Sequence, residues 1–98
     1  MEKETADIEF EWDKKKNAGN IQKHGISFEE AAIVFFDPMH SEIYDSLHSG
    51  LFEDRWKAFG PAGPVLVMVS YTGRNGRIRI ISARKATSGE KEAYYGKC

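Results

Sequence analysis

Apolar and polar residues alternate along residues 77–80, which is the two-residue period of a β-strand with one face in a core. Ile78 and Ile80 fall on one face, and Arg77 and Arg79 fall on the other. The aliphatic face can anchor the strand while the guanidinium groups stay in solvent. A rigid cationic face of this kind suits a polyanion such as a nucleic-acid backbone.

The chain opens with a predicted strand followed by a helix. Residues 8–12 alternate apolar and acidic side chains, which predicts a short strand. Asp13 is a suitable helix N-cap, because its carboxylate can accept the first free backbone N–H groups. Residues 14–24 then predict a helix that ends at Gly25. The positions expected to face inward are Ala18 and Ile21, with Gly19 and Gln22 beside them.

A second helix is marked at both ends. Ser27 and Glu30 have the spacing of a capping box, in which each side chain bonds the other residue's backbone N–H. Residues 31–36 continue this helix with a broad apolar face, and residues 37–38, Asp-Pro, end it.

The rest of the chain predicts mainly strands. Four strand-like stretches cover residues 39–44, 55–59, 65–72 and 77–83, of which 65–72 is the most apolar and is expected to be central. Residues 45–54 form a polar loop, residues 60–64 a turn, and residues 73–76 a hairpin turn with Asn-Gly. A capping box from Thr87 to Glu90 starts a short last helix through about Tyr95.

This order predicts an α+β fold. We expect an antiparallel sheet of about four to five strands, with the two N-terminal helices on one face and a short C-terminal helix. The 98 residues, 41% of them hydrophobic, predict a single domain over residues 1–98.

Composition also narrows the class of protein. No apolar run approaches the ~20 residues that a membrane helix needs, and residues 1–5 lack the apolar core of a secretion signal. The single cysteine, Cys98, offers neither an internal disulfide nor a metal-ligand pattern. We therefore expect a cytoplasmic protein without a cofactor or metal.

Charge is unevenly distributed, although the formal net charge is only −1. Residues 1–73 carry seven Lys/Arg and thirteen Asp/Glu, whereas residues 74–98 carry seven Lys/Arg and two Asp/Glu. Two interpretations follow: a cationic patch for a partner of opposite charge, or acidic and basic groups that lie side by side and cancel.

The histidines do not have a metal-ligand spacing. His24 follows Lys23 at a predicted helix end, where it is either a cation favoured by the helix dipole or a proton-transfer group. His48 lies in the polar loop, either solvated or at the rim of a site.

Other candidates have competing interpretations. Glu53 and Arg55 flank a loop-to-strand junction, where they form either a base and a phosphate contact or an ordinary surface ion pair. Arg84 and Lys85 are either solvated surface residues or an anion site, which is favoured because they precede a helix N-terminus that adds its own attraction for anions.

The aromatic candidates have two interpretations as well. Tyr94 and Tyr95 close the last helix, where one is expected to pack on the sheet and the other to stack on a base or donate its hydroxyl. Trp12 and Trp56 favour core packing, with base stacking as the alternative.

RNA cleavage fits this inventory of groups. The substrate supplies its own 2′-hydroxyl nucleophile, so the protein only has to position the chain, move protons and stabilise a charged phosphorane. We expect the arginines to converge into one anion-binding pocket on the sheet. The alternative is a non-catalytic module whose basic face docks an acidic protein.

Several segments resemble the BrnT toxin family in order and spacing. They are residues 10–13, 23–31 (K-H-G-I-S-F-E-E-A), 34–38, 53–55 and 77–87, which includes R-I-I-S-A-R-K-A-T. The resemblance implies a RelE-like fold and a type II ribonuclease toxin that inhibits translation. It also implies a BrnA-like ribbon-helix-helix antitoxin, a heterotetramer of two toxins and two antitoxins, and operator DNA binding through the antitoxin.

The resemblance also carries candidate site residues onto matching positions. The catalytic candidates are Lys23, His24, Glu53, Arg55, Arg79, Arg84 and, by a looser match, Tyr95; the RNA-binding candidates are Arg77, Lys85 and Trp12. Arg55, Arg79 and Arg84 are expected to contact phosphate or the transition state, and Lys23, His24 and Glu53 to move protons or position the substrate.

Overall fold

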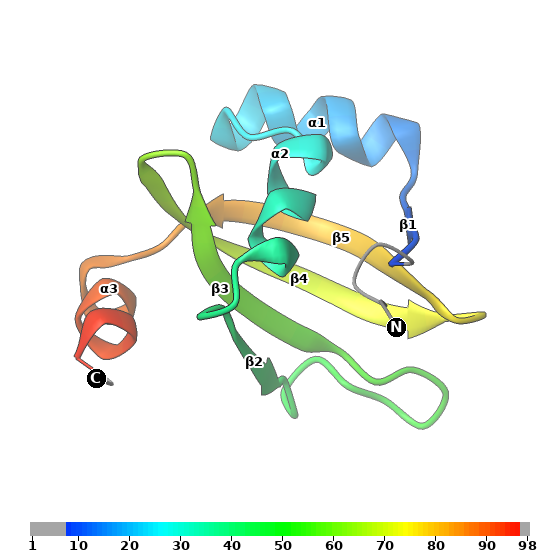
Figure 1. The fold of residues 1–98 in the computed structure, drawn as a ribbon. Helices are drawn as coiled ribbons and strands as arrows, with labels where there is room; N and C mark the ends of the chain where they lie inside the picture. The colour runs from blue at the N-terminus through cyan, green and yellow to red at the C-terminus, as the bar shows by residue number, and fades with distance from the viewer. Residues whose placement is uncertain (1–7, 97–98) are drawn as a thin grey trace, which may run out of the picture.

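A computed structural model describes residues 8–96 as a five-stranded sheet with helices packed on it (Figure 1). The elements are β1 (Phe10–Glu11), α1 (Lys14–His24), α2 (Phe28–Ile33), the 3-10 turn η2 (Val34–Phe36), β2 (Ser41–Tyr44), β3 (Trp56–Ala62), β4 (Val65–Arg74), β5 (Arg77–Lys85) and α3 (Ser88–Tyr95). The predicted α+β class is confirmed, and the architecture is compatible with a RelE-like fold. The expectations for residues 1–5 and Cys98 fall outside the described residues.

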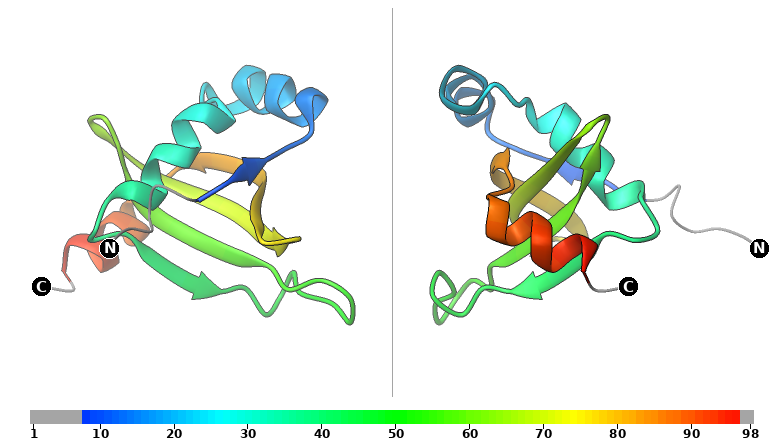
Figure 2. Two further views of the ribbon diagram at one scale, coloured as in Figure 1. Left: turned by 45° about the vertical axis from the view of Figure 1, so that its right-hand side comes forward. Right: turned by 90° about the vertical axis from the view of Figure 1, so that its left-hand side faces the viewer.

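The sheet has the strand order β1-β5-β4-β3-β2, so β4 is central as predicted. All neighbouring pairs are antiparallel except β1 and β5, which run parallel. Helices α1 and α2 cover one face, and Figure 2 shows α3 at one end of the sheet, away from α1. Tyr94 of α3 packs against Phe59, Leu66 and Met68, whose side chains alternate with those that point toward α2. The last helix therefore covers only one end of the opposite face.

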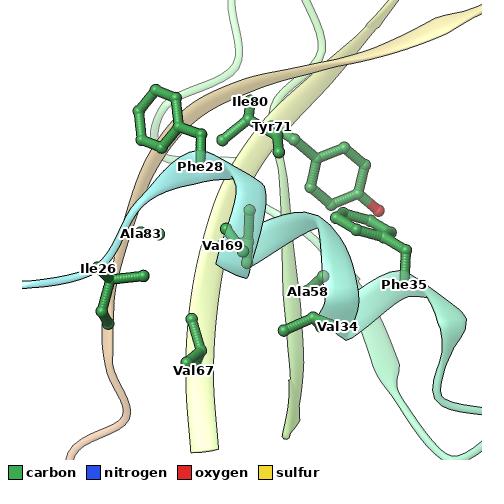
Figure 3. Close-up of a cluster of buried hydrophobic side chains, with 11 residues drawn as sticks. Ile26, Phe28, Val34, Phe35, Ala58, Val67, Val69, Tyr71, Ile80 and Ala83 are labelled. Carbon is green, nitrogen blue, oxygen red and sulfur yellow. The ribbon is translucent and has the colours of Figure 1, made fainter. Parts of the chain in front are cut away.

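The main core lies between α2 with η2 and the middle strands (Figure 3). Its buried side chains are Ile26, Phe28, Ala31, Val34, Phe35, Ala58, Val67, Val69, Tyr71, Ile80 and Ala83. Both predicted capping boxes are formed, at Ser27 with Glu30 and at Thr87 with Glu90, so each helix starts where the sequence places it.

Strand β3 is longer than predicted, because residues 60–62 extend it instead of turning. Pro61 pairs with Leu66 of β4, while β2 reaches only as far as Phe59 along the other edge of β3. Proline has no N–H to donate, and at this position no further strand requires one. Gly63, with φ of 63°, then makes the tight turn into β4.

Helix α1 has the predicted bounds and the predicted Asp13 cap, but the prediction of its inward face is wrong. Ala18, Gly19, Ile21 and Gln22 are exposed, and the buried residue is Asn20. Its side-chain amide donates to the carbonyls of Ile26 and Ala83 at 2.9 Å each and accepts from the N–H of Ala83 at 3.1 Å. Asn20 thus takes the place of a neighbouring strand along the part of β5 that short β1 does not reach.

A β-bulge decides which side chains share the face opposite the core. The register between β4 and β5 shifts between Ser70 and Tyr71, which leaves Ile81 as one extra residue in β5. Strict alternation would put Arg79 and Arg84 on opposite faces, since they are five residues apart. The extra residue places both on the face opposite α2.

Candidate active site

The face of the sheet opposite α1 and α2 is basic. We call it the cationic face, and its basic residues are Arg55, Lys57, Arg74, Arg77, Arg79 and Arg84. The pairs Lys57–Ser70, Arg79–Thr72 and Arg84–Met68 fix its register. The prediction that Arg77 and Arg79 share one face, opposite to that of Ile78 and Ile80, is confirmed.

Acidic partners sit beside the arginines of β5. Arg77 Nε lies 2.8 Å from Glu9 Oε1, and Arg79 Nη1 lies 3.1 Å from Glu11 Oε2. The parallel pairing of β1 with β5 creates both contacts, because it places Glu11 directly beside Arg79. Charge cancellation, the second interpretation of the charge split, is therefore correct at this end of the face.

Two further arginines are also paired. Arg84 holds Glu90 of α3 at 2.8 Å, and Arg55 Nε lies 2.6 Å from Glu53 Oε1. The side chains of Arg55 and Arg84 nevertheless keep 31% and 33% of their surface exposed. Each guanidinium is therefore held in place and still open to an anion from solvent.

A hollow of about 290 Å³ opens on this face where β3, β4 and β5 meet the loop after β2. Its lining residues are Asp45, His48, Arg55, Lys57, Met68, Ser70, Ile81, Ser82 and Arg84. Within residues 8–96, Lys57 has no ion-pair partner. Three cations around one carboxylate make this hollow a suitable site for a phosphate group. Of the arginines expected to converge, Arg55 and Arg84 line this hollow, whereas Arg77 and Arg79 lie farther along the face.

A histidine–aspartate pair forms the rim of the hollow. His48 Nδ1 lies 2.8 Å from Asp45 Oδ2, with the Asp45 side chain 7% exposed and the His48 side chain 63% exposed. Burial alone would raise the pKa of Asp45, but the hydrogen bond with His48 and the positive charge of Lys57 outweigh it and hold that pKa below its ordinary value. Asp45 is therefore a carboxylate that orients an exposed imidazole.

The loop that carries this pair is tied to β3. The N–H of Asp45 donates to the carbonyl of Arg55 at 2.8 Å, and the N–H of Arg55 donates to Ser49 Oγ at 2.8 Å. Ser49 Oγ in turn donates to the carbonyl of Asp45 at 2.8 Å. This ring of hydrogen bonds fixes the backbone of the loop that carries His48 against the backbone of Arg55.

Glu53 lies on the other side of Arg55, at a second hollow of about 410 Å³ that Arg74 also lines. The hydrogen bond from Arg55 holds the pKa of Glu53 below its ordinary value, and the charges of Arg74 and Lys16 act in the same direction. A carboxylate stabilised in this way is a weak base. Its geometry matches the ordinary ion pair more closely than a proton acceptor.

The remaining predicted site residues lie elsewhere. Lys23 and His24 end α1 in the helical layer, and within residues 8–96 no hydrogen bond or ion pair of their side chains links them to the cationic face. Trp12 packs edge-on against Phe28, with ring centroids 6.1 Å apart, so core packing accounts for it.

The two C-terminal tyrosines differ as expected. Tyr94 is buried and donates to the carbonyl of Met39 at 3.0 Å, whereas Tyr95 is 62% exposed. Tyr95 lines a separate hollow together with Lys85 and Lys91. The structure therefore does not bring Tyr95 or Lys85 to the hollow that Arg55 and Arg84 share.

Sequence reasoning missed Asp45 and Lys57 and left open whether His48 is solvated or lies at the rim of a site. The available signal was the Asp-x-x-His spacing at the start of a loop, which lets the two side chains meet across a single turn. Lys57 could have been found from strand alternation, because it lies two residues after Arg55.

The described part of the chain contains no group of three or more His, Cys, Asp or Glu side chains that could hold a metal ion. Within the same residues, no helix is long and apolar enough to cross a membrane.

Comparison with known families connects this geometry to an activity. The profile of the family described as "Ribonuclease toxin, BrnT, of type II toxin-antitoxin system" matches residues 12–90. A comparison with curated proteins gives no significant match. The matched region runs from the end of β1 into α3 and contains the whole hollow. The chain therefore belongs to the BrnT family of ribonuclease toxins of type II toxin–antitoxin systems.

Proposed function

We propose that this protein is a metal-independent endoribonuclease that inhibits translation by cutting RNA at the cationic face. The observation that carries the proposal is the hollow where Arg55, Lys57 and Arg84 surround one side of His48. RNA provides the nucleophile in its 2′-hydroxyl, so cationic groups and a proton acceptor are sufficient for cleavage.

In this proposal the scissile phosphate binds Arg55 and Arg84. Both guanidinium groups are fixed by carboxylates and remain partly exposed, so a phosphate can join or replace those carboxylates. Arg77 and Arg79 extend the same face toward β1 and contact the RNA backbone on one side of the cut. The geometry favours these arginines over Lys23 and His24, which lie in the helical layer.

The proposed partner is a BrnA-like ribbon-helix-helix antitoxin. It would assemble with the toxin as two copies of each in the cytoplasm and bring the complex to operator DNA. The loop beside the hollow supports a protein partner here, because Leu47, Leu51 and Phe52 are 88%, 96% and 99% exposed. A partner that covers these side chains would also close the hollow.

The activity is tested by incubating the purified protein with RNA alone in EDTA and, separately, with RNA and ribosomes in a buffer that contains Mg²⁺. We expect RNA fragments that end in 2′,3′-cyclic phosphate, and no cleavage of an oligonucleotide with a 2′-deoxy residue at the cut. Arg55→Ala and Arg84→Ala should each lower the rate by about 10²-fold or more. Lys15→Ala, which removes the same charge from α1, is the matched control and should retain most of the activity.

Intact RNA under all these conditions, together with harmless expression in the absence of an antitoxin, would exclude the proposal. Cleavage that requires an added divalent cation would exclude metal independence alone.

The second candidate is a non-catalytic module whose basic face docks an acidic protein. The ion pairs of Arg77, Arg79 and Arg84 support this docking candidate, since in each of them the face binds a carboxylate of the chain itself. Binding to RNA should weaken steeply with salt as counterions are released. A protein partner that RNA cannot displace would favour the second candidate.

A further inference from the structure

His48 differs from the other histidines of the described chain in its surroundings. Among residues 8–96 it is the histidine that lines the hollow, whereas His24 ends α1 and His40 contacts Glu42 and the ring of Phe35. Its side chain is 63% exposed, so one side of the ring is accessible to a ligand.

The contact with Asp45 fixes the state of the imidazole ring. A carboxylate oxygen can only accept a hydrogen bond, so Nδ1, which lies 2.8 Å from Asp45 Oδ2, carries the proton. In the neutral ring, Nε2 then holds the free lone pair. Within residues 8–96, Nε2 has no hydrogen-bond partner.

The ring is also held in position by its loop. Asp45 is buried, and its backbone bonds to Arg55 on one side and to His48 and Ser49 on the other. The imidazole is therefore held through Nδ1 by a buried carboxylate, in a loop whose backbone is bonded to Arg55, and both His48 and Arg55 line the hollow. Such fixed placement is what a proton-transfer group requires.

We propose that Nε2 of His48 is the general base of the reaction and that Asp45 is its positioning residue. This assignment depends on the proposed ribonuclease function. It identifies the proton acceptor, which that proposal does not specify. His48 takes the proton of the 2′-hydroxyl, and the 2′-oxygen forms a bond to phosphorus as the bond from phosphorus to the 5′-oxygen breaks. A water molecule protonates the departing 5′-oxygen, and the imidazolium returns its proton to solvent. The products are a 2′,3′-cyclic phosphate and a 5′-hydroxyl.

Other groups at the hollow or next to it are less suited to this role. Glu53 is bound to Arg55 at 2.6 Å, which stabilises its charged form and makes it a weak acceptor. Lys57 is an ammonium group and has no lone pair to accept a proton. His48 remains as the acceptor next to the proposed phosphate position.

The charges that face the ring come from three elements. Asp45 of the loop is negatively charged, while Arg55 at the end of that loop, Lys57 of β3 and Arg84 of β5 are positively charged. The same cations would hold the phosphate whose neighbouring hydroxyl His48 deprotonates. In this proposal, phosphate binding and proton transfer therefore take place in the same hollow.

The test compares single-turnover cleavage by the wild type, His48→Gln and Asp45→Asn over pH 5–9. We expect His48→Gln to lose about 10²- to 10⁴-fold in rate, to bind RNA within about threefold of the wild type, and to lose the rise in rate on the acidic side of the profile. Asp45→Asn should lose rate while keeping an acidic limb. Ser46→Ala, an exposed position in the same loop, should behave as the wild type.

A substrate with sulfur in place of the bridging 5′-oxygen distinguishes a general base from a general acid. Its leaving group needs no proton, so the loss of a general acid would have no effect on this substrate. The defect of His48→Gln should persist on this substrate, and its disappearance would overturn the assignment of His48 as the base. An active wild type with an equally active His48→Gln variant would overturn the role of His48 and leave the proposed function standing. A wild type that leaves RNA intact would overturn both.

Discussion

Arg84 on β5 holds Glu90 on α3 through two parallel hydrogen bonds, from Nη1 to Oε1 at 2.8 Å and from Nη2 to Oε2 at 3.0 Å. The same carboxylate accepts the N–H of Thr87 at 2.9 Å and so completes the capping box of α3. Glu90 therefore joins the last helix to the sheet and at the same time occupies a guanidinium group at the proposed phosphate position. Stability of α3 and anion binding by Arg84 depend on one side chain.

Glu90→Gln should increase the affinity for RNA. Glutamine preserves the cap, because its oxygen can still accept the Thr87 N–H, but it no longer competes with a phosphate for Arg84. We expect RNA to bind about three- to tenfold more tightly, with a steeper salt dependence of the binding constant. Glu92→Gln, which removes the same charge from an exposed position of α3, is the control. Equal affinity of the two variants would contradict a competition at Arg84.

The same pair should make stability depend on acidic pH. The hydrogen bonds from Arg84 lower the pKa of Glu90 from 4.5 to about 2, against the opposing effect of burial. Because the folded-state pKa is the lower one, this stabilisation is complete above about pH 4.5 and is lost as the pH falls toward about 2.

Denaturant unfolding between pH 2 and pH 7 measures this contribution. Since 24% of the Glu90 side chain is exposed, we expect the wild type to lose about 1–2 kcal/mol more than Glu90→Gln over this range. Parallel pH curves for the two proteins would show that the pair contributes nothing to folding.

Local signals in the sequence located most elements of the fold. Asp13 caps α1 through the N–H groups of Lys15 and Lys16, as its position before a helical stretch predicts. The hairpin between β4 and β5 turns at Asn75 and Gly76, which both have positive φ, as Asn-Gly predicts. These features depend on residues within four positions of one another, so the sequence alone carries the information.

The missed features depend on distant parts of the chain. Asn20 is buried because its amide meets the backbone of Ala83, 63 positions away, and no helical periodicity contains that contact. The bulge at Ile81 arises from pairing with β4, so alternation along β5 alone could not place Arg84. His48 likewise reaches the site because its loop is hydrogen-bonded to Arg55, the residue just before β3. The cationic nature of the site was therefore predictable, whereas its geometry was not.

Asn20→Ala tests the unusual inward face of α1. The change leaves the N–H and carbonyl of Ala83 and the carbonyl of Ile26 without their partner in a buried setting. We expect the free energy of unfolding to fall by about 2–4 kcal/mol. Hydrogen exchange at the Ala83 amide should accelerate more than at the centre of β4.

The control for this change is Gln22→Ala, at an exposed position of the same helix, which should alter stability by no more than about 0.5 kcal/mol. Similar stability of Asn20→Ala and Gln22→Ala would mean that water satisfies the edge of β5 and that the asparagine is dispensable.

Two glycines should respond to alanine with opposite signs. Gly60 lies on β3 beneath η2, where an added Cβ would lie 2.9 Å from Val34 Cγ1 and 3.1 Å from His40 Cβ. Both atoms belong to the packed layer over the sheet, so room for the methyl group requires that η2 moves outward. Gly60→Ala should therefore destabilise the protein by about 1–3 kcal/mol.

Gly19 lies in the middle of α1, and an added Cβ there would meet nothing within 4 Å. Because alanine restricts the unfolded chain and suits a helix, Gly19→Ala should stabilise the protein by about 0.5–1 kcal/mol. Thermal and denaturant unfolding of the two variants measure the difference. Since α1 and η2 both lie on the face opposite the hollow, RNA cleavage by Gly19→Ala should stay at the wild-type rate. A loss of cleavage in this stabilised variant would place part of the active site on α1, where Lys23 and His24 lie, and would shift the proposed chemistry away from the cationic face.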